Sequence, residues 1–260
     1  MKVVILAGGL GTRFSEETGV RPKPMIEIGG KPILWHIMKI YAEYGFDEFI
    51  ICLGYKGYMI KEYFINYFLY NSDITVELHN NQLDVHYTNT ESFKVTLVDT
   101  GINTNTAGRI KKIKNYIQGE SFMLTYGDGV CDINIANLID FHKTHGKLAT
   151  LTAIRPPGRF GNIESDGKGL ISKFQEKPED ESQWINGGFF ILDAGIFKYL
   201  EGDVENEQWE KKPLAEIAAD GQLVAYKHSG YWKCMDAMRD KVELEEEWES
   251  GNAPWKIWDK

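Results

Sequence analysis

Glycines and basic residues gather near the start of the chain. Gly8, Gly9 and Gly11 follow a short apolar run, and Arg13 and Lys23 come soon afterwards, with a proline on either side of the lysine. Glycines let backbone N–H groups come close to an anion, and two cations can neutralise the charge of phosphate groups. Proline restricts the backbone, so Lys23 is expected to be held by a stiff segment. The pattern predicts a loop that binds a phosphorylated ligand. The alternative interpretation is a tight turn and a solvated lysine.

Two better-known glycine motifs do not match this loop. A Walker A loop ends in Gly-Lys followed by Ser or Thr, and no such run follows Gly11. A dinucleotide fingerprint needs a third glycine where Phe14 stands, and an acidic residue at the end of the next strand. Glu27 lies near the required spacing, but inside a segment rich in glycine and proline that does not end a strand. The loop therefore disfavours a dehydrogenase or dehydratase.

A second candidate for chemistry is Asp128. It stands between Gly127 and Gly129, directly after the apolar run at 122–125. Carboxylate oxygens, together with phosphates and waters, are the ligands that Mg²⁺ prefers. An aspartate at the end of a strand therefore predicts a metal ligand, with a turn-forming role as the alternative.

The elements that would position these residues alternate between strands and helices. Continuous apolar runs at 3–7 and 49–53 are typical of strands buried on both faces, and apolar residues recur at helical spacing over 33–41 and 56–69. This alternation predicts an α/β fold with a mostly parallel, Rossmann-like sheet and helices on both faces. Further strands are expected at 95–98, 122–125, 149–154, 187–192 and 223–226, and small inserted β-hairpins at 71–89 and 156–172. Ligands bind beyond the carboxyl ends of parallel strands, which points to residues 8–13 and 127–129.

The composition restricts the partners and the compartment of the protein. There are 38 acidic and 29 basic side chains, and the formal net charge of −9 argues against nonspecific nucleic-acid binding. No apolar run approaches the roughly 20 residues that a membrane span needs. Three widely spaced cysteines predict a reducing cytoplasm rather than a disulfide framework. We therefore expect a cytoplasmic protein with no nucleic-acid or membrane partner.

The motifs also resemble those of a known family. Gly8-Gly9-Leu10-Gly11-Thr12-Arg13, followed by Pro22-Lys23-Pro24-Met25, looks like the signature of the sugar-1-phosphate nucleotidylyltransferases. Segments along essentially the whole chain resemble the cytidylyl-transferring branch that acts on glucose 1-phosphate, among them Thr125-Tyr126-Gly127-Asp128-Gly129, Phe174-Gln175-Glu176-Lys177-Pro178 and Ile185-Asn186-Gly187-Gly188. The uridylyl and thymidylyl branches usually have Leu-x-Pro-x-Thr after the arginine, whereas this chain has Phe14-Ser15-Glu16-Glu17-Thr18. The run favours the cytidylyl branch.

The resemblance implies a role for each matching position. The nucleotide-binding residues would be Leu6, Ala7, Gly8, Gly9, Leu10, Gly11, Thr12, Arg13, Lys23, Thr104, Arg109 and Gly127. The match is looser around Thr104 and Arg109, and Arg109 could equally belong to the solvated face of a helix. The metal ligands would be Asp128 and Asp236, although Asp236 could instead cap a helix. The sugar-phosphate side would be formed by Glu176, Lys177, Asn186 and Gly187.

The implied reaction is the formation of CDP-glucose and pyrophosphate from CTP and α-D-glucose 1-phosphate. The sugar phosphate would attack the α-phosphorus in line, with Arg13, Lys23, Asp128 and Mg²⁺ as the catalytic groups. The product would begin a route to CDP-linked deoxysugars of a surface polysaccharide such as the O-antigen of lipopolysaccharide. The alternatives are a uridylyl- or thymidylyltransferase on the same fold, or a catalytically silent nucleotide-sugar-binding subunit.

The same resemblance implies an organisation for the chain. A single nucleotidylyltransferase domain would cover residues 1–241, with a nucleotide-binding part at about 1–130 and a sugar-phosphate-binding part at about 131–241. An acidic helix and tail at 242–260 would follow. The aromatic helix around 63–68 and the three tryptophans of the tail are more apolar than the rim of a monomer needs, so we expect a homo-oligomer.

Overall fold

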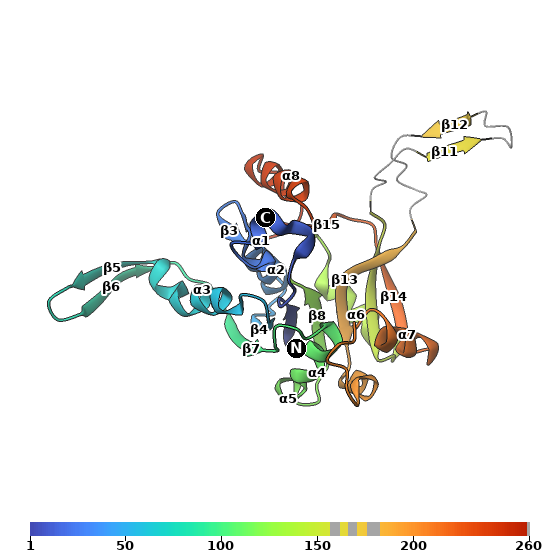
Figure 1. Ribbon diagram of the computed structural model, residues 1–260, viewed down its shortest axis with the longest axis horizontal. Helices are drawn as coiled ribbons and strands as arrows, with labels where there is room; N and C mark the ends of the chain where they lie inside the picture. The colour runs from blue at the N-terminus through green and yellow to red at the C-terminus, as the bar shows by residue number, and fades with distance from the viewer. Residues whose placement is uncertain (157–161, 166–170, 176–182, 259–260) are drawn as a thin grey trace.

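The computed structural model describes residues 1–156, 162–165, 171–175 and 183–258, and its centre is a seven-stranded sheet (Figure 1). The strand order is β14-β10-β13-β8-β1-β4-β7. The bounds of these strands are β1 Val3–Leu6, β4 Glu48–Leu53, β7 Lys94–Asp99, β8 Phe122–Tyr126, β10 Ala149–Ile154, β13 Ile185–Leu192 and β14 Leu223–His228. All neighbouring strands run parallel except β13, which is antiparallel to both β8 and β10. The prediction of a mostly parallel sheet is therefore confirmed.

Helices cover both faces of the sheet, as the alternation of buried side chains in each strand requires. In β1, Val3 and Ile5 pack into one core cluster and Val4 and Leu6 into the other. The first cluster includes residues of α2 Ile33–Ala42, α3 Gly57–Tyr70, α6 Ile135–His145 and α8 Met238–Glu249. The second includes residues of α4 Thr106–Lys112, α5 Lys114–Ile117, the 3-10 helix η3 Ala194–Leu200 and α7 Lys212–Ala219. The molecule is therefore a three-layer α/β fold, and its sheet is mixed because β13 runs antiparallel to its neighbours.

The two expected hairpins are present. Strands β5 Ser72–Glu77 and β6 Gln82–Thr88 pair antiparallel and project away from the sheet beyond the end of α3 (Figure 1). Strands β11 Asn162–Ser165 and β12 Ile171–Gln175 also pair antiparallel. The second hairpin therefore reaches slightly further along the chain than the predicted range 156–172.

Short elements complete the edge of the sheet where the strands end. They are η1 Thr12–Phe14, α1 Ser15–Thr18, η2 Lys23–Met25, β2 Glu27–Ile28, β3 Lys31–Pro32, β9 Gly129–Cys131 and β15 Trp232–Cys234. Strand β15 pairs antiparallel with β9, and Cys234 lies opposite Gly129. This small pair of strands joins a segment near the middle of the chain to one close to its end.

The C-terminal helix and tail pack against the core. Trp255 and Trp258 are almost fully buried, and with Trp248 their rings surround His36 of α2. The predicted boundary at 241/242 falls inside α8, which begins at Met238. Since the tail tryptophans pack into the molecule itself, two of the three that suggested an interface are not available at the surface.

The helix cap of α8 is not the residue that the sequence suggested. The carboxylate of Asp240 accepts hydrogen bonds from the backbone N–H groups of Asp236 and Ala237, at 2.9 and 2.8 Å. The N-cap residue of α8 is Ala237, so the alternative role of Asp236 as the cap of this helix is wrong. Within the described residues, no helix is both long and apolar enough to cross a membrane.

Candidate active site

A cavity of about 920 Å³ lies where β1 and β8 end. Pockets for small molecules usually measure about 300–1,000 Å³, so this one has room for a nucleotide and a second small ligand. Most residues predicted for the nucleotide side line it, namely Leu6, Ala7, Gly8, Gly9, Gly11, Thr12, Lys23, Thr104, Arg109 and Gly127. Leu10 is 50% exposed and is not among the residues that line the cavity.

At two positions of the glycine loop, Gly8 and Gly11, a side chain would collide with a neighbour, whereas a Cβ on Gly9 would meet open space. A Cβ on residue 8 would lie 2.2 Å from a terminal nitrogen of Arg109. Gly11 has a φ of +64°, a conformation that favours glycine, and the hydroxyl of Thr18 donates a hydrogen bond to its carbonyl oxygen. These two glycines are required by the local structure, and the loop they form is one wall of the cavity.

Arg109 supports this loop from inside the protein. Only 4% of Arg109 is exposed, and its guanidinium donates to the carbonyl oxygens of Gly8, Leu53 and Gly101 and to the hydroxyl of Thr100, at 2.6–2.9 Å. The interpretation of Arg109 as part of a solvated helix face is therefore wrong. Its guanidinium ties together the ends of β1, β4 and β7, because Leu53 is the last residue of β4 and the other acceptors follow β1 and β7.

Thr104 is also buried, next to Arg109 in the cavity wall. Its hydroxyl donates to the carboxylate of Glu205, and the ammonium of Lys112 donates to both Thr104 and Glu205. The hydrogen bond to Lys112 fixes this corner of the wall from the exposed side of α4.

Lys23 joins the two predicted metal ligands. Its ammonium donates to the carboxylate of Asp128 at 2.7 Å and to that of Asp236 at 2.6 Å. Burial alone would lower the pKa of Lys23, but the charge of Asp128 and the hydrogen bonds to both carboxylates outweigh it and raise the pKa. The lysine is therefore a permanent cation in the cavity wall, and the two acidic side chains are partly neutralised by it.

Local structure explains how these three side chains meet. Pro22, with a φ of −66°, precedes the short helix η2, which begins at Lys23 and directs the lysine inward. Asp128 follows β8, and Asp236 follows β15. The pairing of β15 with β9 continues into a hydrogen bond from the backbone N–H of Met235 to the carbonyl oxygen of Asp128, at 2.8 Å. Two aspartates far apart in sequence are in this way placed side by side.

The residues at this point fit a divalent cation. Ligand atoms of Asp128, Cys234 and Asp236 all lie within 4.8 Å of one another, and an ammonium group already lies against both carboxylates. Mg²⁺ binds through one or two carboxylates plus substrate phosphates, so Asp128 and Asp236 suit it better than the thiol does. Cys234 was not expected here, because a single cysteine in a sequence carries no such signal.

Of the residues predicted for the sugar side, Asn186 is the one that the structure places in the cavity lining. Asn186 lines the cavity, donates to the hydroxyl of Tyr126 at 3.3 Å and accepts from the N–H of Gly188 at 2.8 Å. Gly187 is not among the residues that line the cavity, and a Cβ on it would be 2.9 Å from the carbonyl oxygen of Thr152. Glu176 and Lys177 lie outside the described residues, as does the side chain of Arg13, whose backbone forms part of η1.

Two further polar residues of the cavity wall were not predicted from the sequence. The hydroxyl of Tyr126 donates to the carboxylate of Glu210 at 2.6 Å, and both residues line the cavity. Burial raises the pKa of Tyr126 above its usual value, so its hydroxyl keeps its proton as a donor. Tyr126 directly precedes the Gly127-Asp128-Gly129 segment and could have been found from that position. Nothing in the sequence around Glu210 points to the site.

The chain is similar to known proteins over its full length. The model of the family described as nucleotidyl transferase matches residues 2–237. The glucose-1-phosphate cytidylyltransferase of Salmonella typhi is 55% identical over 260 residues, which is 100% of both chains. A Bacillus subtilis protein named "Probable glucose-1-phosphate cytidylyltransferase" is 45% identical over 258 residues, covering 99% of this chain and 100% of the other. The crystal structure of HddC from Yersinia pseudotuberculosis has a TM-score of 0.69 at 24% identity, covering 95% of this chain and 99% of that one, and supports the fold.

Proposed function

Because the chain belongs to the nucleotidyl transferase family, we propose that it transfers a cytidylyl group from CTP to α-D-glucose 1-phosphate, forming CDP-glucose and pyrophosphate. The observation that carries this proposal is the 55% identity, over the whole of both chains, with an enzyme named for that reaction. The cavity at the ends of β1 and β8 is large enough for both substrates.

The chemistry requires positioning and charge more than a strong base. An oxygen of the sugar phosphate is already anionic when it attacks the α-phosphorus in line, and pyrophosphate departs with the electron pair of the broken P–O bond. Lys23 would offset the negative charge of the triphosphate from the cavity wall, and Arg13 would do so from the loop. The backbone of Gly8–Gly11 would bring N–H groups to the nucleotide.

The two aspartates are the proposed holders of Mg²⁺. Asp128 and Asp236 would bind the ion, with Lys23 beside them. The ion would neutralise the phosphate charge that develops as pyrophosphate leaves. The convergence of both carboxylates on one ammonium supports this assignment.

We propose that the domain is divided between the two substrates. Residues 1–130 would hold CTP, with Thr104, Arg109 and Gly127 beside the glycine loop. Residues 131–241 would hold glucose 1-phosphate, with Lys177 on its phosphate and Glu176, Asn186 and Gly187 at the sugar. Asn186 beside the hydroxyl of Tyr126 is the kind of polar pair that binds sugar hydroxyls.

We further propose that the enzyme acts in the cytoplasm as a homo-oligomer and supplies CDP-glucose to a route toward CDP-linked deoxysugars of a surface polysaccharide. All three cysteines of the chain, at positions 52, 131 and 234, are free thiols, which fits a reducing compartment.

The test is pyrophosphate release by the purified protein with Mg²⁺. CTP, UTP, dTTP and GTP are each supplied with glucose 1-phosphate, and CTP is then supplied with other sugar 1-phosphates. The proposal expects release with CTP and glucose 1-phosphate well above the other pairs. A preference for UTP or dTTP would assign the chain to a related transferase, and no release with any pair would favour a catalytically silent subunit.

A further inference from the structure

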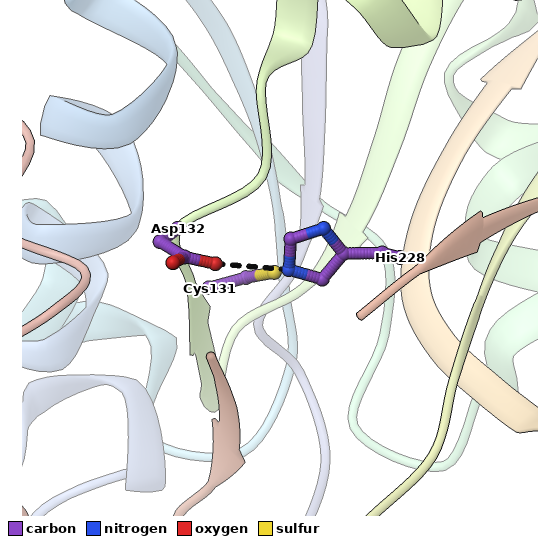
Figure 2. A group of neighbouring side chains, drawn as sticks. All are labelled: Cys131, Asp132 and His228. Atoms are coloured by element: carbon purple, nitrogen blue, oxygen red, sulfur yellow. Dashed lines mark hydrogen bonds and ion pairs between the residues drawn. The ribbon is translucent and has the colours of Figure 1, made fainter. Parts of the chain in front are cut away.

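Away from Lys23, Asp128 and Asp236, three side chains of different chemistry converge between β9 and β14. Cys131 is the last residue of β9, Asp132 follows it directly, and His228 is the last residue of β14. The Cys131 Sγ, a carboxylate oxygen of Asp132 and a ring nitrogen of His228 all lie within 4.8 Å of one another. Figure 2 shows the imidazole pointing from the end of β14 toward the thiol and the carboxylate. The Nε2 atom of His228 lies 2.9 Å from Oδ1 of Asp132.

Burial is graded across this group. Cys131 is fully buried, whereas the side chains of His228 and Asp132 are 12% and 31% exposed. The thiol therefore forms the inner side of the group, and the imidazole and carboxylate form its outer side. An ion bound by all three would keep one side toward solvent.

The backbone that follows His228 leaves space for this arrangement. A Cβ on Gly230 would lie 2.4 Å from Oδ1 of Asp132, and 2.8 and 2.9 Å from two atoms of the His228 ring. Any other residue at position 230 would therefore press on both polar side chains. The glycine keeps the carboxylate and imidazole free to turn toward a common point.

We propose that Cys131, Asp132 and His228 form a second metal site, which takes Zn²⁺ or a similar divalent transition-metal ion. Thiolate sulfur, imidazole nitrogen and carboxylate oxygen are the three donor types that proteins offer to zinc, whereas Mg²⁺ takes oxygen ligands. With metal–ligand bonds of about 2.0–2.3 Å, the ligand atoms of a tetrahedral zinc site lie about 3.3–3.8 Å apart. Because the three ligand atoms already lie within 4.8 Å of one another, only small side-chain movements would bring them to these separations.

Binding exchanges one set of interactions for another. The thiol of Cys131 loses its proton to solvent, and the carboxylate of Asp132 gives an oxygen. The imidazole of His228 stays neutral but changes tautomer: the proton that Nε2 now donates to Asp132 moves through solvent to Nδ1, and Nε2 gives its lone pair to the ion. The hydrogen bond between His228 and Asp132 is replaced by two bonds to the ion. Three protein ligands leave the fourth position to water on the exposed side.

The proposed metal site lies next to the strand pair that leads to Asp128 and Asp236. Strand β9 begins directly after Asp128, and its partner β15 ends two residues before Asp236. The N–H of Asp132 donates to the carbonyl oxygen of Tyr231 at 3.2 Å, next to this strand pair. An ion that joins His228 to the end of β9 would fix the strand pair that carries both aspartates, so its binding should stabilise the protein against heat.

The experiment uses Co²⁺ as a coloured substitute for Zn²⁺. Chelator-treated full-length protein is titrated with Co²⁺ in the presence of excess Mg²⁺, which occupies the carboxylates of the other site. We expect a thiolate-to-cobalt charge-transfer absorption that saturates at one ion per chain and is displaced by Zn²⁺. Melting temperature is recorded with and without Zn²⁺ and should rise on binding.

Replacing each of the three cysteines in turn shows which thiolate causes the absorption. Cys131→Ala should abolish it, while Cys234→Ala and Cys52→Ala should keep it. His228→Gln and Asp132→Asn should each weaken Co²⁺ binding by more than about tenfold, since even second-shell partners of a metal typically change affinity by that factor. The His228 variant tests the proposal independently if Cys131→Ala fails to fold, as judged by circular dichroism.

Three results would overturn the proposal. They are the absence of the absorption at one equivalent of Co²⁺, its persistence in Cys131→Ala, and its loss in Cys234→Ala. The last would place the ion at Asp128 and Asp236. Because the readouts are absorption and melting temperature, they do not depend on whether the chain transfers cytidylyl groups.

Discussion

The guanidinium of Arg109 donates to the carbonyl oxygen of Gly8 at 2.8 Å and occupies the space that a Cβ on residue 8 would need. Each residue therefore restricts the other. The glycine can be replaced only if the arginine moves, and the arginine holds the glycine loop in the shape in which it lines the cavity.

Arg109→Lys should disrupt the loop although it preserves the charge. A lysine cannot reproduce the planar set of donors that now reaches four oxygens, and each lost hydrogen bond of a charged group costs about 1.5–3 kcal/mol. We expect a lower free energy of unfolding and a KM for CTP raised more than that for glucose 1-phosphate. Chemical denaturation and steady-state kinetics measure the two effects. Lys111→Arg, on the same helix, is the matched control and should change neither.

Asp128→Asn and Asp236→Asn should each lower kcat by about a hundredfold or more, by analogy with the loss of one preorganised electrostatic group. Both carboxylates contact the ammonium of Lys23 and are proposed to share one Mg²⁺, so the double variant should be little worse than the poorer single variant. The measurement is turnover at saturating Mg²⁺. Losses that multiply in the double variant would mean that the aspartates have independent tasks.

Lys177→Ala should raise the KM for glucose 1-phosphate at least about tenfold while changing that for CTP much less. The expected reason is the loss of a charge-assisted hydrogen bond to the sugar phosphate, worth about 1.5–3 kcal/mol. Initial rates with each substrate varied in turn separate the two constants. Equal changes in both would remove Lys177 from the sugar side.

Acid should destabilise the protein through His36. Its ring is fully buried, Nε2 lies 2.8 Å from the carbonyl oxygen of Ile28, and burial lowers the pKa to about 4 from 6.5. Between these values the unfolded chain binds a proton that the folded protein does not, so stability is complete above pH 6.5 and is lost as the pH falls toward 4. The slope is about 1.4 kcal/mol per pH unit. Urea denaturation should show this slope, His36→Gln should reduce it, and His79→Gln in the exposed hairpin should leave it unchanged.

Light scattering at micromolar concentration should give a mass above that of one chain. The tail tryptophans no longer support this expectation, since Trp255 and Trp258 are buried. Helix α3 still does, because Ile65, Phe68 and Tyr70 are 73%, 48% and 72% exposed. Apolar side chains gathered in this way mark association surfaces. Ile65→Lys should shift the mass toward that of a monomer, and a wild-type monomer would contradict the expectation.

The parts of the fold that depend on local patterns could be predicted from the sequence. Apolar runs gave the sheet strands, helical spacing gave α2 and α3, and the polar stretch after α3 gave the hairpin of β5 and β6. The glycine loop and Asp128 were also predictable, because each follows the end of a strand, and Lys23 was predictable because prolines flank it.

The remaining features depend on partners that are distant in sequence. Arg109 stands in a run of basic residues typical of a solvated helix face, and it is buried because its acceptors come from three other segments. Asp240 rather than Asp236 makes the capping hydrogen bonds at the start of α8. The sequence could not distinguish the two, because an aspartate at either position is compatible with the start of a helix. Glu210 reaches the cavity through its contact with Tyr126, for which no local pattern exists.

The rings that enclose His36 affect how the protein can fold while it is being synthesised. The N–H of the Trp255 ring donates to Nδ1 of His36 across a separation of 219 residues. At a translation rate of about 5–20 residues per second, a ribosome needs about 10–40 s to pass from one to the other. During that interval the apolar side of α2 has no tail to cover it. We therefore expect the side of α2 that carries His36 to stay uncovered on the nascent chain until the last turn of α8 and the residues beyond it have emerged.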